Sequence, residues 1–422
     1  MLFRSQAPTS ADMYKLPRKS ITAPVFIFFS LCGLYFIVIQ MALSHAPDRF
    51  LEVHKKSKVP LSLSHGALPL LDKILTPLVS FFVSAFGNTS SKAYPTVIHF
   101  VWSFGCAIQL PLIEAERIGM DGARYRNRWS VKLLAYPMIW GILYQRLSGG
   151  WIIPLWLWAF MQSPVRAEGT GIDKLKAESV LAGWLIGHTL PALAMLVPGQ
   201  PAFQKAPLWI AFPILMSLVV LVERIYLYIR SRFHRTSNLG AHSGYLLIQA
   251  LYLSGAIPAF YAHVSHVLFP GLASAPWSAP TNTMYLNKLL GLLRFMYRFF
   301  IPATGLRVPS PAETTADTGV VHFVQFDILV VFAAVWTALI WDLAIRLSTI
   351  HTTRLTKFKW VTLGAITVFV TGLVVSPGAA TSLLLMYRES KLNGSRRSRT
   401  AARQLTGPLV IHSPIAKRTF TY

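Results

Sequence analysis

The chain has 422 residues, of which 53% are hydrophobic and only 13% are charged. Soluble globular proteins carry about 25% charged residues, so this composition excludes a soluble enzyme and a disordered basic protein. The 40 basic residues outnumber the 16 acidic ones, for a net charge of +24. In so apolar a chain, this excess indicates contact with membrane lipids and topology-setting loops, and we predict no nucleic-acid partner. The two cysteines, Cys32 and Cys106, lie in apolar runs and exclude a disulfide-rich secreted scaffold.

Apolar runs of about 20 residues can cross the roughly 30 Å hydrocarbon layer of a membrane as helices. Eight runs of this kind predict an all-α polytopic membrane protein with about eight transmembrane helices. The first run follows basic residues and has no cleavage site behind it, as is typical of a retained anchor. The predicted spans are 21–41, 94–113, 131–161, 179–197, 208–229, 244–269, 320–345 and 360–387.

The third predicted span is interrupted by Gln145, Arg146, Gly149 and Gly150. A broken helix at membrane depth is tolerated where its backbone lines a cavity inside the protein. Segments 66–86 and 281–303 are apolar but carry charges, so we expect interfacial amphipathic helices or lids over a cavity there.

The predicted organisation is a basic N-terminal segment (1–20), a single transmembrane bundle (21–387) and a flexible basic tail (388–422). Eight spans place both termini on one side, and the positive-inside rule places the tail in the cytosol. This topology puts the basic loops around Arg230 and Arg354 on the opposite side.

The acidic residues are few enough to be placed individually. Ten of the sixteen, including Glu389, fall in predicted loops, tails or interfacial segments, where we expect solvated charges. Two others have local partners, because Glu114 has Arg117 three residues later and Asp342 has Arg346 four residues later; for Glu114 a structural pair and a functional role both remain open. Two more fit span ends, where Glu116 would face lipid headgroups and Glu178 would complement a helix N-terminus.

Glu223 and Asp327 have no basic residue three or four positions away. An ionised carboxylate at membrane depth costs several kcal/mol, so each marks a candidate functional site. A carboxylic acid in apolar surroundings stays protonated near neutral pH, as a proton donor must. Gln325 and His322 lie close to Asp327 in sequence and could order it and reload its proton. The alternative is that Asp327 only bonds a neighbouring helix.

Other polar and aromatic side chains in the spans are candidates for substrate contacts. Gln109 would bridge helices or contact a polar substrate head, and His99 could contact substrate or accept a proton. Aromatic rings stabilise buried cations by about 2 kcal/mol, although such rings are also ordinary core residues in membrane proteins. We predict no metal site, and the absence of an Asp-rich motif argues against ionisation of a prenyl diphosphate. The aromatic candidates are Trp102, Phe326 and Trp336.

Three motifs together resemble the integral membrane terpene cyclases of fungal meroterpenoid pathways, of the ascochlorin, ascofuranone and macrophorin type. The resemblance covers about residues 90 to 385. The motifs are His99-Phe-Val-Trp102 with Gln109-Leu-Pro-Leu-Ile-Glu114, the stretch Ser179-Val-Leu-Ala-Gly-Trp-Leu-Ile-Gly187-His-Thr-Leu-Pro191, and Phe323-Val-Gln-Phe-Asp327 followed by Trp336.

The resemblance implies a cyclase that acts without metal or cofactor on a farnesylated aromatic or quinone-like polyketide. Protonation of its terminal epoxide or alkene would start a carbocation cascade that closes rings. Asp327 matches the acid of the family's aromatic-Gln-aromatic-Asp pattern, and Glu114 is the second candidate for the acid or the terminating base. Glu114, Glu223 or His99 would accept the final proton.

Two other functions remain open from the residues. A transporter of a lipophilic small molecule would use the same cavity without chemistry, whereas ion pathways usually string polar groups together. A sterol-type isomerase or reductase is the third hypothesis. For the cyclase, we expect the endoplasmic reticulum membrane as the location and a lipophilic farnesylated molecule as the substrate.

Overall fold

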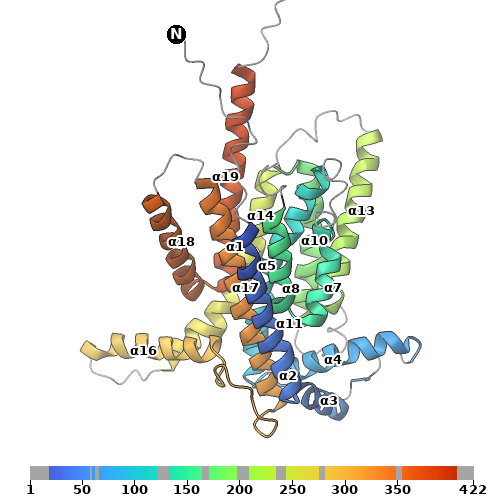
Figure 1. Cartoon of the computed structure of the whole chain (residues 1–422). Helices are drawn as coiled ribbons and strands as arrows, with labels where there is room; N and C mark the ends of the chain where they lie inside the picture. Colours follow the sequence, from blue (N-terminus) through green and yellow to red (C-terminus); the bar gives the residue numbers. More distant parts are fainter. Residues whose placement is uncertain are drawn as a thin grey trace, which may run out of the picture.

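In the computed structural model, the chain is an all-α membrane protein (Figure 1). The structure describes residues 19–57, 59–61, 66–121, 133–163, 171–196, 209–233, 244–274, 281–347 and 354–405. Within these ranges, seven helices are long and apolar enough to cross a membrane, which confirms the predicted fold class. Residues 1–18 and 406–422 of the predicted terminal segments lie outside the described residues, as do residues 131 and 132 of the third predicted span.

The helices follow one another with short π-helical turns (η) in three places. In chain order they are α1 (Lys19–Gly33), η1 (Leu34–Ile39), α2 (Gln40–Leu43), α3 (Ala46–Lys56), α4 (Pro69–Phe86), α5 (Ala93–Asp121), α7 (Pro137–Leu147), α8 (Gly149–Gln162), α10 (Lys174–Trp184), η2 (Leu185–Thr189), α11 (Leu190–Leu196), α13 (Phe212–Phe233), α14 (Tyr245–His263), η4 (Val264–Leu268), α15 (Phe269–Ala273), α16 (Thr281–Phe300), α17 (Ala316–Leu347), α18 (Arg354–Val374) and α19 (Pro377–Leu405).

Helix α5 forms the centre of the bundle, where α14, α17 and α19 pack around it. In its most apolar stretch, 94% of the residues are buried inside the protein. Small residues let the neighbouring helices approach closely, since a Cβ added to Gly378 of α19 would lie 2.4 Å from the Cα of Ser103. The depth of α5 in the bundle means that its polar side chains must find partners on other helices.

The third apolar segment is broken, as predicted, because α7 and α8 meet at Ser148, where φ is +92°. Helix α8 begins against the Phe104 ring of α5, and its Phe160 lies below the Arg388 guanidinium. Arg388 in turn bonds Glu114, ten residues beyond Phe104 on α5. Helices α5 and α8 therefore run in the same direction. The chain between them turns back at Ser148. The prediction of a crossing span at 131–161 is wrong.

The eighth predicted span, 360–387, is also wrong. It is divided between α18, which ends at Val374, and α19, which begins at Pro377; between them Ser376 has a φ of +141°. With these two changes, the end of α13 and the start of α18 lie at the same end of the bundle as the last turns of α19 (Figure 1). The prediction that the neighbouring basic segments lie opposite the tail is therefore wrong.

Helices α4 and α16 lie across the other end of the bundle (Figure 1). This orientation agrees with the interfacial placement predicted for segments 66–86 and 281–303, although α4 is by length and composition apolar enough to cross. Helix α19 continues to Leu405, so residues 388–405 are helical and do not belong to a flexible tail. Arg388 and Glu389 are buried in the bundle, and the prediction of a solvated Glu389 is wrong.

Candidate active site

An aromatic cavity of about 330 Å³ lies beside α17 at the depth of the α7–α8 break. Its walls come from η1, α2, α3, α4, α5, α7, α8 and α17. This volume is at the lower end of the range for small-molecule sites, roughly 300–1,000 Å³. The cavity is therefore large enough for a compactly folded lipophilic chain. Its aromatic lining residues are Phe50, Phe81, Phe82, Phe100, Phe104, Tyr144, Trp209 and Phe323.

Asp327 of α17 is the one acidic residue lining this aromatic cavity in the described part of the chain. The residue is 2% exposed. Its Oδ1 accepts a hydrogen bond from the Ser148 hydroxyl at 3.3 Å and another from the backbone N–H of Gly150. The Gly149 backbone also bonds this carboxyl group, and we assign the proton to Oδ2, which neither Ser148 nor Gly150 contacts.

The first turn of α8 holds Asp327 in place. Backbone N–H groups at a helix N-terminus carry partial positive charge and stabilise a nearby carboxylate. Ser148 is the N-cap of α8, and its hydroxyl oxygen accepts a bond from the Trp151 amide at 3.4 Å. A Cβ on Gly150 would lie 2.6 Å from Ile37 and 3.0 Å from Asp327 Oδ1, so glycine is needed for this close approach.

Helix α7 supplies the polar edge of the cavity. The buried Tyr144 ring packs edge-on against Phe104, with 5.3 Å between centroids. Gln145 and Arg146 follow in the last turn of α7 and also line the cavity. The arrangement combines one buried acid, a hydroxyl, a guanidinium and a wall of aromatic rings, which is chemistry suited to proton transfer and to a cationic intermediate.

Gln325 and His322 do not hold Asp327, contrary to the sequence-based hypothesis. Residues two positions apart on a helix point in different directions. The Gln325 amide donates to the carbonyl oxygens of Phe299 at 2.8 Å and Arg298 at 3.1 Å, at the end of α16. His322 lies 3.3 Å from the Phe36 carbonyl, which can only accept, so its Nε2 is the donor. Neither side chain lines the aromatic cavity.

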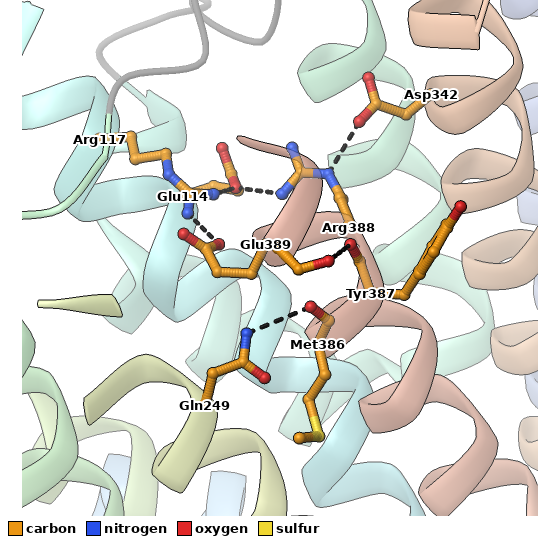
Figure 2. Close-up of polar contacts among 9 residues, drawn as sticks. Glu114, Arg117, Gln249, Asp342, Met386, Tyr387, Arg388 and Glu389 are labelled. Atoms are coloured by element: carbon orange, nitrogen blue, oxygen red, sulfur yellow. Dashed lines mark hydrogen bonds and ion pairs between the residues drawn. The ribbon is translucent and has the colours of Figure 1, made fainter. Parts of the chain in front are cut away.

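Glu114 belongs to a buried ion-pair cluster formed by Glu114, Arg117, Asp342, Arg388 and Glu389 (Figure 2). Arg117 bonds both Glu114 and Glu389, which confirms the predicted local pair of Glu114. Arg388 donates to Glu114 and to Asp342, each at 2.8 Å. The side chain of Arg346, the partner predicted for Asp342, lies outside the described residues. The cluster joins α5, α17 and α19.

The predicted acids Glu114 and Glu223 are not brought to Asp327. Glu114 is ten residues from Phe104 on α5, which is about 15 Å along the helix axis, and it is not among the cavity residues. Glu223 is partly buried on α13 and also lies outside the cavity. Glu116 pairs with Arg224, so the prediction that it faces headgroups is wrong.

His99 and Gln109 make contacts between helices. The Leu373 carbonyl accepts from His263 Nε2 at 2.9 Å, so His263 Nδ1 must accept from His99 Nε2 at 3.1 Å. The Gln109 amide donates to the Leu251 carbonyl at 2.8 Å and accepts from Ser382 at 3.1 Å. This geometry matches the helix-bridging alternative for Gln109, and neither side chain lines the aromatic cavity.

The three aromatic candidates also lie away from the aromatic cavity. Trp102, on α5, is buried in the hydrophobic core. Phe326 stacks on Phe36 with 4.6 Å between centroids. Trp336 donates to the Thr381 hydroxyl at 2.8 Å and lines a separate apolar groove among α16, α17 and α18.

The sequence reasoning missed the residues that hold Asp327 and most of those that enclose it. Gly149 and Gly150 were identified only as a helix break, although a Ser-Gly-Gly step inside an apolar run is the signal of a helix N-terminus at membrane depth. The aromatic residues of α3 and α4 carry no comparable signal, because rings are common at membrane interfaces.

The fold and this site define an all-α integral membrane protein with one acid in an aromatic cavity. The chain belongs to the CtvD family, whose domain matches residues 22–392. This is a family of fungal secondary metabolism. No curated protein and no solved structure matches the chain.

Proposed function

We propose that this protein is a membrane terpene cyclase of meroterpenoid biosynthesis, acting on a farnesylated aromatic or quinone-like polyketide. The observation that carries the proposal is Asp327, the single acid among the described residues lining the aromatic cavity. Membership of a secondary-metabolism family supports a biosynthetic role. We place the enzyme in the endoplasmic reticulum membrane, into which so lipophilic a substrate would partition.

Asp327 starts the reaction by giving the proton on Oδ2 to the terminal epoxide oxygen or to the terminal alkene carbon. With an epoxide, the C–O bond breaks and the oxygen becomes a hydroxyl group. The remaining carboxylate keeps its bonds from Ser148 and Gly150 at the start of α8. These donors stabilise the anion and so make the buried acid a stronger proton donor than burial alone would.

The aromatic rings then stabilise the cation while alkene π electrons form the new C–C bonds. A desolvated ring contributes about 2 kcal/mol to a nearby cation. The cavity also excludes bulk water, which would otherwise capture the cation as an alcohol. Phe323 lies one turn before Asp327 on α17 and Phe104 lies on the neighbouring α5, so these rings are the ones we expect to contact the first cation formed.

Asp327 itself is the best candidate for accepting the final proton. Loss of a proton from carbon ends the cascade and forms an alkene, and the Asp327 carboxylate is free to take that proton. Glu114, Glu223 and His99, proposed above for this step, do not line the cavity. The reaction is then an isomerisation, because the proton given at the start is recovered at the end.

The experiment is product analysis with full-length protein in microsomes, using farnesyl phenols with and without a terminal epoxide. The proposal predicts a product of unchanged mass with at least one new carbocycle by NMR. In deuterium oxide, alkene protonation would leave one deuterium on carbon, whereas epoxide opening would not. Glu223→Gln is the matched control, an acid outside the cavity whose loss should leave turnover unchanged. If neither substrate is isomerised, the proposal is wrong.

A further inference from the structure

A second cavity of about 430 Å³ adjoins the aromatic cavity near the start of α17. Met41 lines both cavities. Helix α17 also serves both, since Phe323 and Asp327 line the aromatic cavity while His322 and Gln325 line the second. His322 is five residues from Asp327, about 7.5 Å along the helix axis. One extended ligand could therefore occupy both cavities.

The second cavity, called the polar cavity below, differs from the aromatic cavity in its chemistry. Its lining comes from the end of α2, the end of α16, the connection to α17, the start of α17 and the residue before α5. Charged and hydroxyl-bearing side chains dominate it, whereas the aromatic cavity has a single acid. The polar lining residues are Ser44, Lys92, Arg298, Thr304, Glu313, Thr314, Asp317, Thr318, His322 and Gln325.

The two acids of the polar cavity already have partners. Asp317 Oδ1 accepts from the Ala93 amide at 3.0 Å. Glu313 accepts from Arg307 at 3.1 Å. A hydrogen bond from Ser310 and the charge of Arg307 lower the pKa of Glu313, so it stays ionised and paired near neutral pH.

The two cations of the polar cavity are not paired in this way. Lys92 and Arg298 are exposed and have no ion pair within the described part of the chain. Arg298 is held at the backbone, where its carbonyl oxygen accepts from Gln325 at 3.1 Å. His322 donates to Phe36 and so can only accept at Nδ1, 3.4 Å from the Thr304 hydroxyl. Because Arg307 offsets Glu313, the charges of Lys92 and Arg298 outweigh the single remaining charge of Asp317, and the net charge available to a ligand is positive.

We propose that the polar cavity binds the head group of the substrate, an acidic phenol, enol or carboxylate in its anionic form. The terpenoid chain then passes Met41 into the aromatic cavity, with its end at Asp327. Lys92 and Arg298 are assigned as specificity residues that recognise head-group oxygens. This inference rests on the proposed function, because it uses the substrate class proposed there.

The experiment measures binding separately from chemistry. Detergent-purified full-length protein is titrated with an acidic phenol that is ionised at the assay pH and carries a saturated farnesyl chain, which cannot cyclise, and with its methyl ether, which lacks the acidic oxygen. Arg298→Gln and Lys92→Gln should each weaken phenol binding roughly fivefold, the scale of a partly exposed charge contact. Binding of the ether should be unchanged. Arg294→Gln, on the same helix, and Lys73→Gln, on α4, are exposed controls outside the cavity.

Two results would overturn the assignment of the polar cavity. In the first, Arg298→Gln and Arg294→Gln bind the phenol equally well. In the second, Arg298→Gln weakens the phenol and the ether by the same factor, which would indicate a general structural effect. Failure of the proposed function has a different signature, since full turnover of Asp327→Asn would refute the proton-donor role and leave these binding results intact.

Discussion

Arg388→Met tests whether the ion-pair cluster is structural. Arg388 is 1% exposed and donates to Glu114 and Asp342 at 2.8 Å each. Methionine keeps most of the side-chain volume but removes the charge that these two buried carboxylates share. Breaking a buried pair in this way costs about 3–5 kcal/mol. At roughly 2 °C per kcal/mol for a chain of this size, Tm should fall by roughly 6–10 °C.

The assay is thermal unfolding of the detergent-purified protein, with turnover measured per folded molecule. Lys391→Met is the matched control, since Lys391 is an exposed residue on the same helix. Because Glu114 lies about 15 Å along α5 from the aromatic cavity, Glu114→Gln should also lower Tm while leaving specific turnover unchanged. The reasoning is refuted if Arg388→Met melts like Lys391→Met, or if Glu114→Gln abolishes turnover without a change in Tm.

Three further predictions concern the active site, the pH dependence of stability and the orientation of the protein in the membrane. Gly150→Ala should lower turnover roughly 10- to 100-fold, because its Cβ would lie 3.0 Å from Asp327 Oδ1. Gly364→Ala, which has open space around its Cβ, should match the wild type. Equal turnover of the two variants would contradict the placement of Gly150 against Asp327. Burial lowers the pKa of His54, so the folded state binds this proton less tightly than the unfolded chain, and Tm should fall as pH drops below about 6.5. Unfolding at pH 7.5 and 5.5 measures this, and a His54→Gln variant with the same pH dependence would refute it. With the basic segments at one end of the bundle, a C-terminal epitope should be digested by protease added to sealed microsomes, and full protection would mean the opposite orientation.

The sequence predicts much of the fold because the length of an apolar run is a local property. All eight predicted spans begin within about two turns of the start of an observed helix, and the break at Gly149 and Gly150 is visible in the residues themselves. Whether that broken segment crosses or turns back depends on its packing against α5 and α19. This information lies in contacts with Phe104 and Arg388 and is absent from the segment.

The site is less predictable, since its polar contacts join distant parts of the chain. Asp327 was identified because no cation lies near it on its helix, but Ser148, its hydroxyl partner, is 179 residues away. Arg388 and Glu389 look like the start of a basic tail, yet their partners on α5 are 274 and 272 residues distant. Because acids are scarce, the sequence identifies the candidate acidic residues. Only the packed structure shows which acid lines a cavity and which belongs to an ion pair.

The proton-donor role of Asp327 is tested most directly by the turnover of Asp327→Asn, measured with the farnesyl phenols alongside binding of the saturated phenol. Asparagine keeps the shape of the side chain but cannot donate a carboxylic proton. General acid catalysis contributes about 10²- to 10⁴-fold, so turnover should fall by that factor while binding stays within about twofold of the wild type. Turnover equal to the wild type, with binding intact, would contradict the assignment.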